Sequence, residues 1–160
     1  MLNFFQAKQE TENNDPVFNK GCFGKAEFQN EFIQFGIGDN DLVLFRKQLR
    51  DVGWLIARGT QSSSEAVYRH LPDIHFILMN PGQISTNAGI ISPRIDLSGR
   101  HFPLVIFNSI RNYRLKRQTS VVPVLLQEFF EQALELLLTD LKGVDLSEFQ
   151  ESIENFSGVS

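Results

Sequence analysis

The sequence predicts an α/β protein in which an antiparallel meander packs against long helices. Three apolar runs, at residues 74–79, 88–95 and 102–107, are separated by short gaps rich in turn residues. Strands joined so closely pair antiparallel, because a parallel crossover needs about a dozen residues or more. Residues 39–59 and 121–142 instead repeat their apolar side chains every three or four positions, which is typical of helices.

The chain is long enough for one domain with a substantial core. It has 160 residues, of which 42% are hydrophobic, and a domain of this size buries about 70% of the surface of its unfolded chain. Fifteen phenylalanines predict a core rich in aromatic side chains. We expect residues 1–20 to form a flexible lead-in, residues 21–156 a single domain and residues 157–160 a short tail.

The first helix is expected to begin at Asp39 or Asn40, either of which can cap its free N–H groups, and to stop at Gly59. A second, short helix is expected to end before Pro72. Further strands are expected upstream, at residues 32–35 and 22–23. The buried face of the first helix is predicted to carry five apolar residues at helical spacing: Leu42, Phe45, Leu49, Val52 and Ile56.

The helix expected at residues 121–142 is apolar over most of its circumference. Only a narrow polar stripe interrupts it, so one face of a sheet cannot cover it. Two covers are open. One is the closing helix expected at residues 146–156, with Phe149, Ile153 and Phe156 on one side, and the other is a second protein.

Charge and composition argue against several classes of partner. The net charge of −4 gives no general attraction to nucleic acid or to anionic lipid. No segment reaches the roughly 20 apolar residues of a membrane span. The single cysteine, Cys22, excludes an intrachain disulfide and a cysteine-rich zinc site. A cytoplasmic location fits these features best.

The sequence contains no recognisable catalytic or metal-binding set. The serine hydrolase elbow G-x-S-x-G is missing, as are the metal spacings H-x-x-x-H and C-x-x-C. Gly21 and Gly24 precede Lys25 without the spacing of a phosphate-binding loop, so they are interpreted as turn glycines. We therefore expect no metal and no cofactor.

The stretch SPRIDLSGRHFPL, residues 92–104, gathers charged side chains between two expected strands. Asp96 can bond to its own downstream backbone, and Gly99 tolerates the positive φ that tight hairpins need. Arg94 and Arg100 are then expected to face each other, or to pair with Asp96, across the neck of a hairpin.

A second group of basic residues follows the last expected strand: Arg111, Arg114, Lys116 and Arg117. Their positive charges stand out beside an acidic C-terminal third. They form either a solvated loop that joins the strand to the next helix or a docking patch for an acidic surface of a partner.

The segment P-R-I-D-L-S-G-R-H-F-P-L, residues 93–104, resembles the motif P-x-V-D-x-x-G-R-x-F-P-L of the TagF/ImpM family. Members of that family are accessory proteins of the bacterial type VI secretion system. The upstream G-C-F-G-K, residues 21–25, is similar to the family's opening G-F-F-G-K. The matching positions that we expect to be structural are Gly21, Gly24, Lys25, Gly99, Phe102, Pro103 and Leu104.

The resemblance implies a three-layer α-β-α sandwich around a central sheet that is largely antiparallel or mixed. It also implies a cytoplasmic accessory protein rather than an enzyme: a post-translational repressor of type VI secretion that engages a forkhead-associated scaffold protein. We expect a monomer or a weak homodimer. Its partner surface is expected to combine Arg94, Asp96 and Arg100 with the basic residues at 111–117.

Two alternatives stay open. In the first alternative the protein would be a structural subunit of the secretion apparatus. In the second it would be an enzyme in which Arg94, Arg100 and His101 bind an anionic substrate at the neck of the hairpin. An anion bound there beside an acid or a base would favour the enzyme.

Overall fold

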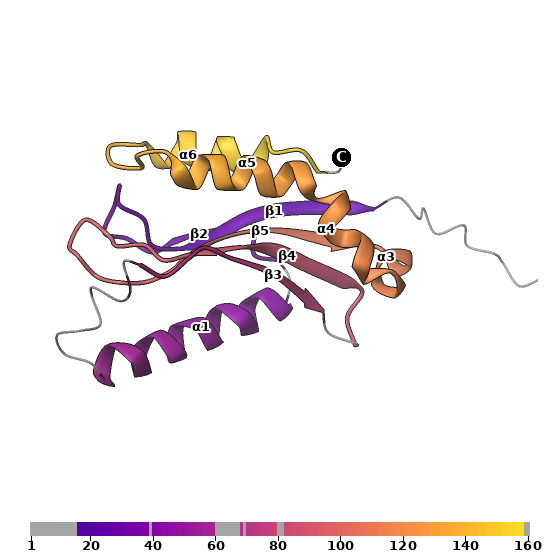
Figure 1. Ribbon diagram of the computed structural model, residues 1–160, viewed down its shortest axis with the longest axis horizontal. Helices are drawn as coiled ribbons and strands as arrows, with labels where there is room; N and C mark the ends of the chain where they lie inside the picture. The colour runs from indigo at the N-terminus through magenta and orange to yellow at the C-terminus, as the bar shows by residue number, and fades with distance from the viewer. Residues whose placement is uncertain (1–15, 39, 60–67, 69, 80–81, 159–160) are drawn as a thin grey trace, which may run out of the picture.

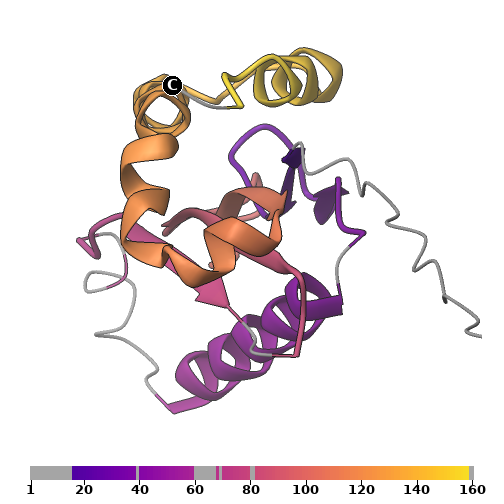
Figure 2. The ribbon, with the colours of Figure 1, turned by 90° about the vertical axis from the view of Figure 1, so that its right-hand side faces the viewer.

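A sheet covered by helices on both faces forms the described part of the chain, shown in Figure 1 as a computed structural model. The structure describes residues 16–38, 40–59, 68, 70–79 and 82–158. One helix lies against one face of the sheet, and the helices of the C-terminal third lie against the other (Figure 2). The predicted three-layer α-β-α sandwich is therefore confirmed.

The sheet is antiparallel throughout and has the strand order β2-β1-β5-β4-β3. The first strand in the chain pairs with the last, from Val17 opposite Arg111 to Phe23 opposite Val105. Among the described strands, β2 and β3 form the two edges of the sheet. The strands are β1 (Val17–Gly24), β2 (Ile33–Phe35), β3 (Ile74–Met79), β4 (Ser85–Ser92) and β5 (Leu104–Arg111).

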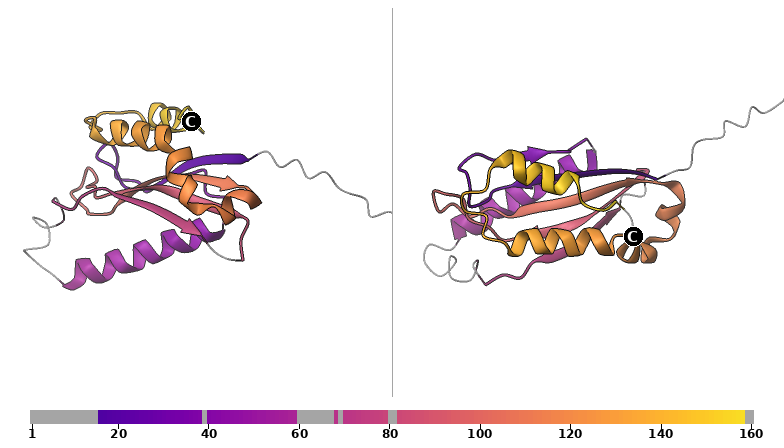
Figure 3. Two further views of the ribbon diagram at one scale, coloured as in Figure 1. Left: turned by 45° about the vertical axis from the view of Figure 1, so that its right-hand side comes forward. Right: turned by 90° about the horizontal axis from the view of Figure 1, so that it is seen from above.

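The helices divide between the two faces. α1 covers one face alone, whereas α5 and α6 lie side by side on the other, as the two views in Figure 3 show. The helical segments are α1 (Asn40–Gly59), α3 (Tyr113–Arg117), the 3-10 turn η1 (Thr119–Val121), α4 (Val122–Leu125), α5 (Gln127–Leu138) and α6 (Leu146–Glu154).

Successive side chains of the central strands point into two separate cores. On β5, Leu104 and Ile106 join the core beneath α5 and α6, whereas Val105 and Phe107 join the core beneath α1. The Phe23 ring of β1 lies in the second core, with its centroid 6.2 Å from that of Phe107. A strand that is buried on both faces favours apolar residues at successive positions, which explains the apolar run of residues 104–107 in β5.

The first helix agrees with its prediction. α1 runs from Asn40 to Gly59. Leu42 is fully buried, and Phe45 and Leu49 pack against the same core. The side chains expected to continue this stripe toward Gly59, and most of the short helix expected before Pro72, lie outside the described residues.

The strand boundaries depart from the apolar runs. β3 covers residues 74–79 as predicted, but β4 begins at Ser85 and ends before Pro93, and β5 begins after Pro103. Proline lacks the N–H that a ladder needs, so it limits both strands. Buried polar residues start β4 and continue β5, and for this reason hydropathy alone misplaced the ends: Ser85, Thr86, Asn87, Asn108 and Ser109.

The expected lead-in at residues 1–20 is too long. Residues 17–20 belong to β1, where Phe18 lies opposite Ile110 and packs against the core beneath α5 and α6. The polar side chains of Asn19 and Lys20 hide this part of the strand from a search for apolar runs. At the other end, the backbone N–H of Ser157 donates to the Gln132 side chain at 2.7 Å, so the expected tail begins as packed chain.

The helix expected at residues 121–142 is broken. Its first part forms η1 and α4, the backbone bends at Leu126, and α5 continues only to Leu138. The bend allows Leu126 to face the same core as Phe129 while α5 turns to run along the sheet. Beyond Thr139, which is extended, Leu141 folds back into the core.

The closing helix covers the sheet beside α5 rather than the outer side of α5. Phe149 and Ile153 of α6 are fully buried, and the Phe156 ring that follows meets Phe129 at 6.0 Å. Leu138, at the end of α5, is 82% exposed. The closing helix therefore packs into the same core as α5 but does not cover the outer side of α5.

Replacing Gly21 by alanine tests the close approach of β1 to its neighbours. A Cβ at this position would lie 2.4 Å from the Phe35 carbonyl oxygen and 2.5 Å from the Phe107 ring. We expect Gly21→Ala to lower the free energy of unfolding by at least about 2 kcal/mol, because backbone and core must shift. Urea unfolding followed by circular dichroism measures the difference. Gly38→Ala is the matched control, since a Cβ at Gly38 has nothing within 4 Å, and a similar loss in both variants would contradict the argument.

Candidate functional site

The predicted hairpin between β4 and β5 is present, and we call residues 94–101 the hairpin corner. Ile95 and His101 form an isolated antiparallel bridge at its neck. The backbone N–H of Gly99 donates to the Asp96 carbonyl oxygen at 2.9 Å, and Gly99 has a φ of +80°. A left-handed residue is needed to close this turn, which accounts for the glycine.

The carboxylate of Asp96 is the centre of the hairpin corner. One oxygen accepts the backbone N–H groups of Ser98 and Arg100, each at 2.9 Å. The other accepts Lys25 Nζ and Arg100 Nε, each at 2.7 Å. The Asp96 side chain is fully buried, so these four donors take the place of water around the charge.

Burial alone would raise the pKa of Asp96. The hydrogen bond from Lys25, the backbone and side-chain hydrogen bonds from Arg100 and the positive charge of Lys25 outweigh it and lower the pKa to about 2. The carboxylate therefore stays ionised at any physiological pH. An acid with so low a pKa and no accessible oxygen is not suited to general acid or base catalysis.

The same contacts join the two sequence motifs. Lys25 Nζ and Arg100 Nη2 both donate to the Asn30 carbonyl oxygen, at 3.1 and 2.9 Å. Gly24, at the end of β1, lies against the backbone of Pro103, because a Cβ on it would stand 2.0 Å from the Pro103 carbonyl oxygen. The glycine-lysine and aspartate-glycine-arginine motifs thus form one structural unit.

Other motif residues extend this unit by packing. The Phe102 ring meets Phe32 edge-on, with centroids 5.3 Å apart. Leu104 is fully buried beneath α5 and α6. These contacts lie within the protein, and the structural role of the motif residues stays a prediction.

Arg94 is committed to internal partners. Its guanidinium donates to Ser92 Oγ at 3.0 Å, to Glu27 Oε1 at 3.2 Å and to the Leu137 carbonyl oxygen. Only 15% of the side chain is exposed. Arg94 thus links the end of β4 to the end of α5 by hydrogen bonds, and its guanidinium is directed into the protein.

The hairpin corner offers no prepared site for an anionic substrate. The guanidinium of Arg94 meets the Glu27 carboxylate, and that of Arg100 meets Asp96. The His101 ring lies against Tyr68, with centroids 4.7 Å apart. The geometry therefore gives no support to an enzyme that uses these three side chains to bind an anion.

The structure separates the two halves of the expected partner surface. β5 runs from Leu104, beside the hairpin corner, to Arg111, beside α3 (Figure 1). An eight-residue strand spans roughly 24 Å. Arg111, Arg114 and Arg117 are all exposed, and we call these three residues the basic end; the side chain of Lys116 lies outside the described residues. The expected solvated loop is partly the helix α3, which Asn112 caps by accepting the backbone N–H groups of Arg114 and Leu115.

The described residues also bear on the thiol, metal and membrane features considered in the sequence. Burial raises the pKa of the Cys22 thiol well above its ordinary value, and Cys22 is 0% exposed. No cluster of three His, Cys, Asp or Glu side chains suited to a metal ion occurs in the described part of the chain. No described helix is both long and apolar enough to cross a lipid bilayer.

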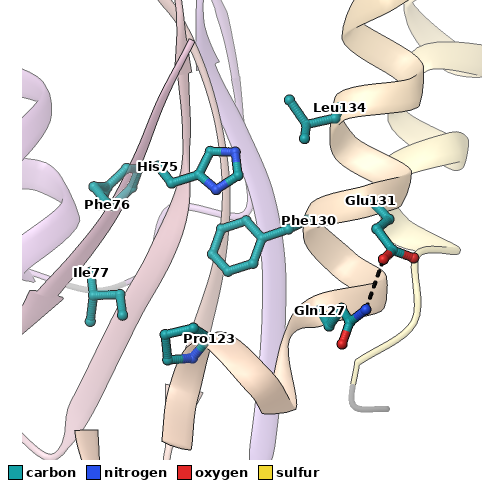
Figure 4. Close-up of a pocket in the computed structure, with 8 residues that line it drawn as sticks. All are labelled: His75, Phe76, Ile77, Pro123, Gln127, Phe130, Glu131 and Leu134. Atoms are coloured by element: carbon teal, nitrogen blue, oxygen red, sulfur yellow. Dashed lines mark hydrogen bonds between the residues drawn. The ribbon is translucent and has the colours of Figure 1, made fainter. Parts of the chain in front are cut away.

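A hollow of about 490 Å³ lies between the edge strand β3 and the α4–α5 segment (Figure 4). Sequence reasoning missed it, because its walls come from segments about 50 residues apart in the chain. The one signal in the sequence is that β3, an edge strand of the sheet, contains no Asp, Glu, Lys or Arg. The hollow is lined by His75, Phe76, Ile77, Pro123, Gln127, Phe130, Glu131 and Leu134.

Comparison with known proteins identifies one family and one fold. A family model for the TagF N-terminal domain, described as type VI secretion system-associated, matches residues 21–156. The crystal structure of PA0076 from Pseudomonas aeruginosa PAO1 is similar, with a TM-score of 0.70 and 21% sequence identity, and the similarity covers 87% of this chain and 63% of that one. At this identity the likeness shows a shared fold. None of the curated proteins compared matches this sequence.

Replacing Asp96 by asparagine tests whether its charge holds the hairpin corner. The variant keeps an oxygen acceptor but leaves Lys25, which is 15% exposed, without a counter-ion. We expect the free energy of unfolding at pH 7 to fall by about 2 to 4 kcal/mol, measured by urea unfolding. Arg100→Gln is the control, since 59% of the Arg100 side chain is exposed and its loss should cost less than about 1 kcal/mol.

The effect of Asp96→Asn should depend on pH. The pKa of Asp96 is lower in the folded protein, about 2, than its ordinary value of 3.8. Its charge therefore stabilises the fold fully above its ordinary pKa, and this stabilisation is lost as the pH falls through about 2. The difference between wild type and variant should shrink over this interval. A difference that stays constant down to pH 2 would show that the charge is not its source.

Proposed function

Because the chain belongs to the TagF N-terminal domain family of type VI secretion system-associated proteins, we propose that it is a regulatory protein-binding module of that system. The observation that carries the proposal is the hairpin corner, whose charged groups bind one another. Asp96 is surrounded by four internal donors and Arg94 by three internal acceptors. Most of the charge in this corner is used inside the protein, which supports a role as a scaffold.

The regulatory role that we propose is repression of secretion after translation, in the cytoplasm, by engaging a forkhead-associated scaffold protein. The likeness of residues 93–104 to the TagF/ImpM motif supports this assignment. A module that acts only by binding needs a stable shape and an exposed surface, and it needs no cofactor. The protein is proposed to be an accessory binding protein and not an enzyme.

The basic end is the surface that we assign to the scaffold partner. Its three arginines are exposed and project from the end of β5 and from α3. Clustered positive charge on a chain of net charge −4 steers an acidic surface to one place on the molecule. The hairpin corner, at the opposite end of β5, is assigned a structural role.

Deleting the gene distinguishes repression from a structural role. We expect loss of a repressor to raise secretion of type VI substrates into the medium, measured by immunoblotting. Loss of a structural subunit would abolish secretion instead. Complementation with the wild-type gene must restore the original level of secretion. A deletion strain with unchanged secretion would contradict both the repressor role and the structural role.

Charge reversal at the basic end tests the assigned surface. We expect the double variant Arg114→Glu/Arg117→Glu to lower affinity for the forkhead-associated protein by about tenfold or more, because favourable pairs become repulsive. Calorimetry with the two purified proteins measures the change. Lys47→Glu/Arg50→Glu on α1 is the matched control, since both side chains are exposed and the change in net charge is the same. Equal losses in the two variants would exclude a specific contact at the basic end.

A further inference from the structure

The edge strand β3 lacks two of the sequence features that often protect a sheet edge. It pairs with β4 on one side, and no described strand lies on its other side. Natural edges commonly carry a charged side chain, a proline or a bulge, because unpaired N–H and C=O groups attract another strand. Ile74–Met79 contains no charged residue and no proline. Ile74, Ile77 and Met79 are 53%, 39% and 41% exposed.

The hollow opens directly beside this edge. Phe130 reaches from α5 toward β3, where its ring stacks on His75 with centroids 4.9 Å apart and planes at 4° (Figure 4). His75 and Ile77 are alternate residues of β3 that both line the hollow. A strand added to this edge would place its own alternate side chains about 5 Å from these two. One of those side chains would enter the hollow, where apolar groups form most of the wall.

The carboxylates at the hollow and next to it give this part of the rim an acidic character. Glu131 lines it, Glu135 follows one turn later on α5, and the exposed Asp73 immediately precedes β3. Neither β3 nor α5 contains a lysine or an arginine, and none lines the hollow. The complementary occupant therefore carries positive charge on either side of an apolar residue.

The same charges argue against two other occupants. A second copy of the chain would bring Asp73, Glu131 and Glu135 toward their own counterparts, on a molecule whose net charge is −4. Residues 1–15 contain Glu10, Glu12 and Asp15 against the single Lys8, so this segment is acidic as well. Like charges brought together in this way oppose association.

We propose that β3 and the hollow bind an extended segment of another protein, in which a large apolar residue is flanked two positions away on each side by lysine or arginine. The segment adds to the sheet through backbone hydrogen bonds, its apolar side chain fills the hollow, and its basic side chains meet the acidic rim. This inference refines the proposed function as a binding module. The residues that line the hollow do not include those of the basic end.

The test uses a capped synthetic peptide, Thr-Lys-Thr-Phe-Thr-Lys-Thr, titrated into the full-length ¹⁵N-labelled protein. We expect amide shifts concentrated in β3 and α5, and an affinity at least about tenfold higher than that of two matched peptides. One matched peptide replaces both lysines by glutamate, and the other replaces phenylalanine by alanine. Raising the salt to about 0.5 M should weaken binding of the lysine peptide.

Two substitutions locate the site. Ile77→Lys places a charge on the edge and should abolish the shifts, whereas Val17→Lys, at a 60% exposed position on β1, should leave them unchanged. Glu131→Lys should lower affinity for the lysine peptide and raise it for the glutamate peptide. This exchange of preference cannot come from misfolding, so it keeps the test valid if Ile77→Lys proves unstable.

Several results would overturn the proposal. These are no binding of the lysine peptide, equal binding of the three peptides, or binding that Ile77→Lys and Glu131→Lys leave unchanged. So would a wild-type dimer that Ile77→Lys dissociates, or nuclear Overhauser contacts from residues 1–15 to β3, since another occupant would then hold the edge. Secretion unchanged by gene deletion would contradict the proposed regulatory role but would leave the peptide titration intact. The two ideas can therefore fail separately.

Discussion

The fold depends on the pairing of β1 with β5 in the middle of the sheet. These strands lie about 90 residues apart in the chain, yet they align from Val17 opposite Arg111 to Phe23 opposite Val105. Both are covered on two faces, so the pairing shapes the core beneath α1 and the core beneath α5 and α6 together. Gly21 permits the close approach, because any larger residue would meet the backbone of Phe35 and Gly36 at the end of β2. Loop closure over this distance is slow and costly, and the contacts at both ends of the pair offset it.

The hairpin corner stabilises one end of the β1–β5 pair. Asp96 receives Lys25, which follows β1, and Arg100, which precedes β5, so a single buried carboxylate joins the two strands beyond their last backbone bonds. A buried charge is favourable only when its partners are complete, and this one has four donors. The contacts of Asp96, Lys25 and Arg100 thus lie within the scaffold. The recognition surface that we propose is the basic end, at the other end of β5.

The sequence predicted what local patterns encode. α1 followed from its apolar spacing and its final glycine. The contact of Arg100 with Asp96 is one of the two arrangements expected across the neck of the hairpin. Lys25 could not be assigned to Asp96, since nothing in a single sequence relates residues so far apart. The break at Leu126 was missed because apolar periodicity continues through it, and only packing against the sheet decides where the backbone bends. The hollow was missed for a related reason: it exists only where β3 and α5 meet, and neither segment alone describes a concave surface.

Cys22 gives the molecule a built-in reporter. It is the only cysteine in the chain, it lies in the C-terminal half of β1, and its side chain is fully buried in the core beneath α5 and α6. A thiol reagent can reach it only when β1 separates from its neighbours or the C-terminal helices lift away. The rate at which a disulfide-forming dye labels this one atom thus measures how often the interior opens. Local opening of the structure can therefore be followed in solution without introducing another cysteine.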